Sequence, residues 1–113
     1  MLDLDDFKTV TPDDLTAALG FQIYKELSKE EQDAVFKPIY DEDLQVFYLM
    51  KNDKAYVPAL HTKEINFEAL NALEEKLKEH KIFLAIVDNT INILYYQISE
   101  GLSDKPVNSK NSI

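Results

Sequence analysis

The chain has 113 residues, of which 45% are hydrophobic, and its 21 acidic residues outnumber 12 basic ones for a net charge of −9. That length suits one compact domain with a modest core, and the absence of cysteine excludes disulfides, thiolate catalysis and cysteine-ligated metals. Every basic residue is lysine, so the chain also lacks the arginine fork that favours phosphate and guanine, which argues against a free-standing nucleic-acid binder.

Acidic residues are concentrated in the first part of the chain. Residues 1–43 hold 12 of them against 4 lysines, whereas residues 44–113 hold 9 against 8. Two interpretations stay open for this first part: a docking surface for a basic partner, or a solvated acidic surface. Residues 1–10 (MLDLDDFKTV) predict a flexible acidic lead-in that is too polar for a secretory signal.

The first helix is predicted from Thr11, as its cap, to about Leu27. Pro12 suits the first helical position, and the acids that follow favour the positive end of the helix dipole. Gly20 lies in mid-helix at a cost of about 1 kcal/mol relative to alanine, which indicates close packing. The apolar stripe comprises Leu15, Leu19, Ile23 and Leu27. A second capping box at 28–31 predicts a short helical turn through Ala34.

Three extended segments follow. Val35–Tyr40 contains Pro38, which favours an edge position because proline cannot donate to a sheet ladder. Leu44–Met50 (LQVFYLM) is almost entirely apolar, as expected of a strand covered on both faces. Ala55–Leu60 is a short strand or extended segment.

The last part of the chain predicts a helix and a β-hairpin. Asn66 caps a helix from Phe67 to about His80, whose apolar residues recur at helical spacing. Ile82–Val87 is a strongly apolar strand, residues 88–90 form a turn, and Ile91–Ile98 alternates without a fully polar side. Both faces of this last strand are therefore expected to be covered, one of them by another chain. Residues 103–113 predict a disordered tail.

These elements predict an α/β fold: a single small domain over residues 11–102, with a mixed β-sheet packed by two main helices. No stretch of the roughly 20 apolar residues needed to cross a bilayer is present, so no membrane insertion is expected.

The usual catalytic motifs are missing. The sequence has no glycine-rich phosphate loop, no nucleophile elbow and no zinc-binding HExxH. His61 and His80 are the available imidazoles, and ordinary surface or capping roles explain them better than catalysis. Paired acids at helix starts are explained by capping and solubility. We therefore expect no catalytic residue, no metal and no cofactor.

Residues 82–102 (IFLAIVDNTINILYYQISEGL) resemble the C-terminal hairpin of the tRNA-splicing endonuclease family. In that family a strand of the form LAxV leads through a short polar turn to I-V-Y-Y. The corresponding residues here are Leu84–Val87, the turn 88–90 and Ile93–Tyr96. The resemblance spans roughly residues 15–102, and its best match is the small accessory subunit of the Sen-fifteen type.

The resemblance implies a domain like the tRNA-intron endonuclease catalytic domain, of restriction-endonuclease-like fold. Catalytic subunits of the family use a tyrosine, a histidine and a lysine. An ungapped match puts His80 at the lysine position, with Lys81 one place away, and Ile39–Asp43 offers no histidine on the middle strand pair. These departures predict a structural subunit that is not itself an enzyme.

The resemblance also implies the partners. Such a subunit pairs through its C-terminal strand with a catalytic subunit, this heterodimer joins a second pair in a heterotetramer, and precursor tRNA is met indirectly through the complex. Family members also use an acidic loop that docks into a basic groove of a neighbouring subunit. If the hairpin turn is that loop, Asp88 is the only acidic residue that it keeps here. The predicted interface residues are Ile91, Ile93, Leu94, Tyr95, Tyr96, Ile98 and Asp88.

Two alternatives stay open beside the structural subunit. One is a stand-alone acidic interaction module of the same fold, which could form a homodimer in isolation through the same strand. The other is a weak ribonuclease that uses His80, Lys81 and a tyrosine. The family implies a nuclear location, or the cytoplasmic face of mitochondria in some fungi.

Overall fold

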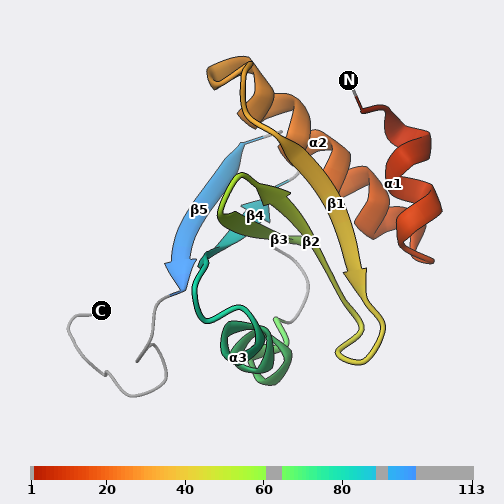
Figure 1. Cartoon of the computed structure of the whole chain (residues 1–113). Helices are drawn as coiled ribbons and strands as arrows, with labels where there is room; N and C mark the ends of the chain where they lie inside the picture. The colour runs from red at the N-terminus through yellow and green to blue at the C-terminus, as the bar shows by residue number, and fades with distance from the viewer. Residues whose placement is uncertain (1, 61–64, 89–91, 99–113) are drawn as a thin grey trace.

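A computed structural model of the chain describes residues 2–60, 65–88 and 92–98 (Figure 1). Within these residues, three helices accompany one mixed five-stranded sheet of order β1-β2-β3-β4-β5, which confirms the predicted α/β class. The elements are α1 (Leu4–Val10), α2 (Asp14–Glu30), β1 (Phe36–Asp41), β2 (Val46–Lys51), β3 (Lys54–Leu60), α3 (Phe67–Lys76), β4 (Lys81–Val87) and β5 (Ile93–Ile98).

The sheet combines antiparallel hairpins with one parallel pair. β1, β2 and β3 are antiparallel neighbours, β3 and β4 run parallel with α3 between them along the chain, and β5 returns antiparallel to β4. β1 and β5 are the edges, so the edge position predicted from Pro38 is confirmed. Pro58 is tolerated in β3 because the pairing with β2 extends only as far as Tyr56, which leaves Pro58 paired on the β4 side alone.

Helices cover the two faces of the sheet from opposite sides (Figure 1). The α2-side cluster consists of the buried residues Phe7, Ala17, Ile23, Tyr24, Leu27, Phe47, Leu49, Tyr56, Ala85 and Val87. The α3-side cluster consists of the buried residues Val46, Tyr48, Ala55, Val57, Leu70, Leu73, Ile82, Leu84 and Ile98. β2 and β4 contribute to both clusters, which explains why their sequences are apolar at nearly every position.

The N-terminal residues differ from the flexible lead-in predicted for residues 1–10. Leu4–Val10 form helix α1, whose capping box joins the backbone and side chains of Asp3 and Asp6. Phe7 is fully buried and its ring lies 5.7 Å from that of Phe21, centroid to centroid. Acids that looked like a solvated segment therefore cap a helix, and a single aromatic side chain anchors that helix to the core.

Helix α2 also has other limits than predicted. Its N-cap is Asp13, whose carboxylate accepts from the Thr16 amide, and not Thr11. The helix continues through the predicted second capping box to Glu30, so no separate helical turn begins at Ser28. Because the helix is uninterrupted, Leu27 stays buried in the α2-side cluster. This burial outweighs the local capping signal at Ser28.

Boundaries in the second half are closer to the sequence predictions. Asn66 caps α3, as predicted, but the helix ends at Lys76 instead of His80, and a short turn leads to β4. Among the predicted features, His61, Ile91 and the tail 103–113 lie outside the described residues.

Gly20 occupies a close contact, as its mid-helix position indicated. A Cβ atom built on it would lie 2.6 Å from Cε2 and 2.9 Å from Cζ of Phe47, and 3.2 Å from Cδ2 of Phe7. Both rings are buried in the α2-side cluster, so a side chain at position 20 would force them to shift.

We predict that Gly20→Ala destabilises the protein by about 1–2 kcal/mol, because overpacking outweighs the gain in helix propensity. Urea unfolding measures the change. Ala18→Gly, at an exposed position of the same helix, is the control and should lose about 1 kcal/mol through propensity alone. Gly20→Ala with stability equal to or above wild type would contradict the close packing.

Candidate functional site

β5 is a sheet edge with one side unoccupied within the described part of the chain. Six of its residues pair with β4, from Val87 with Ile93 to Ile82 with Ile98. The backbone groups on its other side face no other strand formed by residues 2–60, 65–88 or 92–98. Such an edge is a template for pairing with another chain.

The side chains of β5 alternate between packed and exposed positions. Ile93 and Tyr95 pack against the α2-side cluster, and Ile98, which is 4% exposed, belongs to the α3-side cluster. Leu94 and Tyr96 are each 54% exposed. Of the predicted interface residues that the structure describes, only Leu94 and Tyr96 therefore offer large apolar surface, whereas Ile93, Tyr95 and Ile98 pack within the domain itself.

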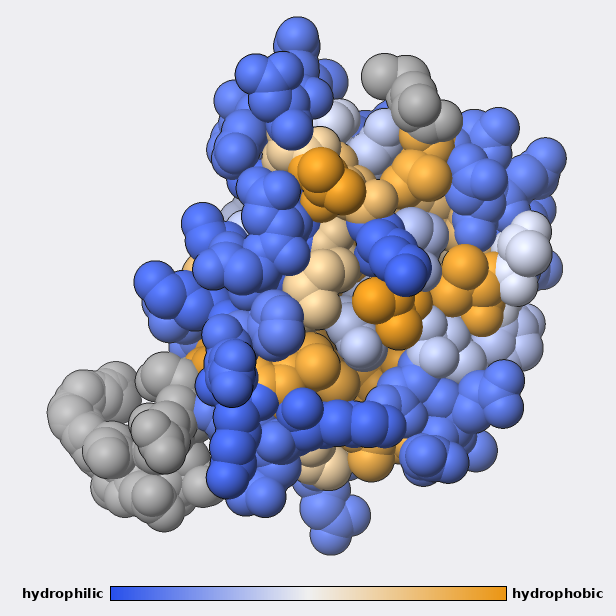
Figure 2. Space-filling model, in the orientation of Figure 1, coloured by the Kyte–Doolittle hydropathy of each residue, from blue (hydrophilic) through white to orange (hydrophobic). Residues whose placement is uncertain are grey.

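In the orientation of Figure 1, apolar residues come to the surface in the middle of the view, above α3, and hydrophilic residues surround them (Figure 2). Helix α3 has only ten residues and covers part of this face. The partly buried residues of the α3-side cluster include Ile39, Met50 and Ile86.

Tyr95 makes a contact that the sequence did not signal. Its hydroxyl donates a hydrogen bond of 2.8 Å to Oε1 of Glu26 on α2, and its ring meets that of Tyr56 edge-on at 5.8 Å. Burial raises the pKa of the Tyr95 hydroxyl well above its usual range, and the hydrogen bond to the Glu26 carboxylate raises it further. The hydroxyl therefore stays protonated and remains a donor at any physiological pH.

Asp88 lies at the beginning of the turn between β4 and β5. Its amide donates to the Asn92 carbonyl, and its carboxylate accepts from the Asn92 amide at 3.3 Å. This carboxylate thus helps to close the turn. An interface role for Asp88 stays a prediction.

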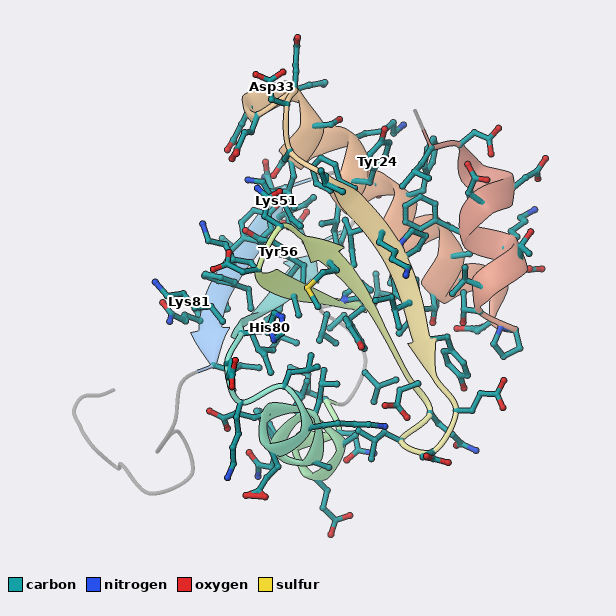
Figure 3. The ribbon with its side chains drawn as sticks, in the orientation of Figure 1. Tyr24, Asp33, Lys51, Tyr56, His80 and Lys81 are labelled. Atoms are coloured by element: carbon teal, nitrogen blue, oxygen red, sulfur yellow. The ribbon has the colours of Figure 1, made fainter. Side chains whose placement is uncertain are left out.

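His80 and Lys81 do not form part of an assembled catalytic site with the segment Ile39–Asp43. The two lie at the start of β4 (Figure 3), and cross-strand pairing aligns Lys81 with Lys54. Asp41 is paired with Val46 at the opposite end of the sheet. Nδ1 of His80 is buried without a hydrogen-bond partner among the described residues.

Three lysines on neighbouring strands lie in register at the end of the sheet where β4 begins. Lys51 is the cross-strand neighbour of Lys54, and Lys54 is the neighbour of Lys81. The side chain of Lys51 is only 9% exposed, and its Nζ lies 2.8 Å from the carboxylate of Glu31 at the end of α2. This ion pair offsets part of the repulsion that like charges directly opposite one another produce.

A hollow of about 240 Å³ lies near the opposite end of the sheet, where β2 and β3 are no longer paired. Most of the residues that line it are apolar, Leu19, Val57 and Leu70 among them, and the helix starts at Asp13 and Asn66 border it. No group of three or more histidines and acids in residues 2–60, 65–88 and 92–98 could hold a metal ion. No described helix is long and apolar enough to cross a membrane.

Residues 22–109 match the family model described as Sen15 protein. A search of curated proteins found no match. The matched range begins within α2 and includes the whole sheet.

Two ion pairs make the stability of this fold sensitive to acid. The hydrogen bond from Lys51 lowers the pKa of Glu31 below its ordinary 4.5, and the hydrogen bonds from Lys76 and then from the Leu44 amide lower the pKa of Asp41 below its ordinary 3.8. Since both pKa values are lower in the folded state, this stability is present above about pH 5 and is lost as the pH falls through the folded values.

We predict that Lys51→Met reduces the difference in unfolding free energy between pH 7 and pH 3, because Glu31 loses the cation that lowers its pKa. Urea unfolding at the two pH values measures this difference. Lys29→Met changes an exposed lysine of α2 and is the control. An unchanged pH dependence in Lys51→Met would show that the pair is not linked to acid unfolding.

Proposed function

Since the chain belongs to the Sen15 family, whose members are subunits of the tRNA-splicing endonuclease, we propose that it is a non-catalytic structural subunit that pairs with a catalytic subunit through β5. Its role would be to support excision of introns from precursor tRNA. The observation that carries this proposal is that β5 combines an unpaired edge with the exposed side chains of Leu94 and Tyr96.

These two features of β5 supply different parts of a protein interface. The unpaired backbone groups offer hydrogen bonds to an added strand, and they are directional. Leu94 and Tyr96 lie two residues apart on one face, so a partner that adds a strand also buries them. Tyrosine is among the side chains that most often dominate the affinity of protein interfaces, and burial of leucine adds to it through the hydrophobic effect.

The other edge of the sheet is much less suited to pairing. β1 contains Pro38, which has no amide hydrogen to donate, and helix α1 lies against this strand. Lys37 and Asp41 add charges along it. The contrast between the two edges supports β5 as the strand that meets the partner.

The non-catalytic part of the proposal rests on residues that are missing or misplaced. The segment Ile39–Asp43, at the end of β1 and in the turn after it, has no histidine where the resemblance expects one, and it ends far along the sheet from His80. With three acids at positions 41–43, it would also repel a scissile phosphate. Precursor tRNA would therefore be gripped mainly by other subunits of the complex.

The resemblance adds the remaining parts of the proposal. The pair of this chain and a catalytic subunit would join a second, similar pair in a heterotetramer. The complex would act in the nucleus, or on the cytoplasmic face of mitochondria in some fungi.

We predict that Leu94→Asp abolishes retention of a co-expressed catalytic subunit, because it buries a charge in the interface. Phe67→Asp is the matched control: Phe67 is also 54% exposed, and aspartate is favourable at the first position of α3. Affinity purification of the tagged chain followed by mass spectrometry measures retention.

Retention of the partner by Leu94→Asp would exclude β5 as the interface. If wild type retains no catalytic subunit and light scattering instead shows a dimer that Leu94→Asp disrupts, the stand-alone module would replace our proposal.

We predict that the isolated chain does not cleave intron-containing precursor tRNA, since the segment Ile39–Asp43 has no histidine and ends at the opposite end of the sheet from His80 and Lys81. Gel analysis of labelled RNA, with the assembled endonuclease as the positive control, measures cleavage. Cleavage by wild type that is lost in His80→Ala would contradict the non-catalytic role and favour the ribonuclease.

A further inference from the structure

We propose that Tyr95 is a positioning residue for the interface: its hydrogen bond to Glu26 fixes β5 against α2 in the orientation that a partner strand needs. This inference rests on the proposed function, because it concerns the same strand. It differs from the expectation that Tyr95 itself touches the partner.

β5 needs such a tie because its backbone is held on one side only. Interior strands are fixed by hydrogen bonds to two neighbours, whereas β5 is bonded only to β4. The other edge strand, β1, has helix α1 packed against it. Within the described residues, β5 reaches the α2-side cluster through Ile93 and Tyr95.

The contacts of Tyr95 restrict the orientation of its side chain. Its hydroxyl and the Glu26 carboxylate come from residues 69 positions apart in the chain and meet at 2.8 Å in a partly buried place. Its ring stands nearly perpendicular to that of Tyr56, at 83°, and Tyr56 is in turn stacked on Phe83 at 5.0 Å. The ring is therefore held by β3 and its hydroxyl by α2, so β5 has one defined position at Tyr95.

A defined position of β5 matters because hydrogen bonding between strands tolerates little misalignment. Donor and acceptor must come within about 3 Å along several residues at once, and misaligned hydrogen bonds weaken steeply. A strand that pivots about its bonds to β4 presents its outer edge at a range of angles. The partner then has to order β5 as it binds, and this ordering lowers the affinity.

A second tyrosine provides a matched test. Tyr95→Phe and Tyr40→Phe each delete one hydroxyl from a partly buried strand residue of the α2-side cluster, but Tyr95 is hydrogen-bonded to Glu26, whereas Tyr40 lies on β1 at the other edge of the sheet. We expect Tyr95→Phe to weaken binding of the purified catalytic subunit about tenfold in Kd and Tyr40→Phe to change it less than twofold. Hydrogen exchange of the β5 amides in the free chain should become faster in Tyr95→Phe only.

Glu26 supplies the reciprocal test. Glu26→Gln keeps a side-chain oxygen that can accept from the hydroxyl, so it should retain most of the affinity. Glu26→Leu removes the acceptor and should match Tyr95→Phe.

A stability control separates positioning from general loosening of the core. Ile23→Val removes one buried methylene from the α2-side cluster and leaves Tyr95 and Glu26 intact. When it is compared with Tyr95→Phe at equal thermal stability, Ile23→Val should bind the catalytic subunit like wild type. An equal loss of affinity in Ile23→Val and Tyr95→Phe would overturn the positioning role.

The result for wild type tells the two proposals apart. If wild type binds the catalytic subunit and Tyr95→Phe binds equally well, the positioning role is wrong and the proposed function stands. If wild type does not bind, the proposed function falls and the positioning role falls with it.

Discussion

The parallel pairing of β3 with β4 is the constraint on which the rest of this domain depends. Parallel neighbours cannot be joined by a tight turn, so the chain between them must leave the sheet and cross over one face. Here that crossover carries α3, and the seven paired residues from Lys54 with Lys81 to Leu60 with Val87 fix where it leaves and returns. The opposite face is then left to α1 and α2, which is why the central strands are apolar on both sides.

The same constraint leaves β5 only partly covered. α3 is short and packs on the α3-side cluster, but Leu94 and Tyr96 stay 54% exposed beside it. On the other face, within the described residues, the Tyr95 hydroxyl bonds to α2 and Ile93 packs against the α2-side cluster. The surface that we assign to a partner is thus a direct result of where a crossover helix can be placed, without any special sequence motif.

Sequence patterns predicted the main elements and the two-sided burial of the strands because these follow from local apolar periodicity. They failed at α1, where the acids of a capping box look the same as those of a solvated segment, and a single phenylalanine decides between the two. They also failed at the start of α2, since Thr11 and Asp13 can both cap a helix and only tertiary packing selects one.

The candidate site was predictable in part for the same reason. Alternation in β5 placed Tyr95 and Tyr96 on opposite faces, but which of them faces inward depends on the register with β4. The partner of Tyr95, Glu26, is an ordinary helix glutamate that no local pattern distinguishes. Likewise, the lysine row spans three strands and becomes visible only once they are aligned.

The proline in β1 has a consequence for what happens when this chain is made in excess. A sheet that accepts a neighbour at both edges can grow without limit, as amyloid does. Because Pro38 and α1 obstruct one edge of this sheet, a molecule joined through β5 presents no second edge of equal quality. Each molecule can then associate through one edge only, so surplus copies would form closed dimers and not fibres.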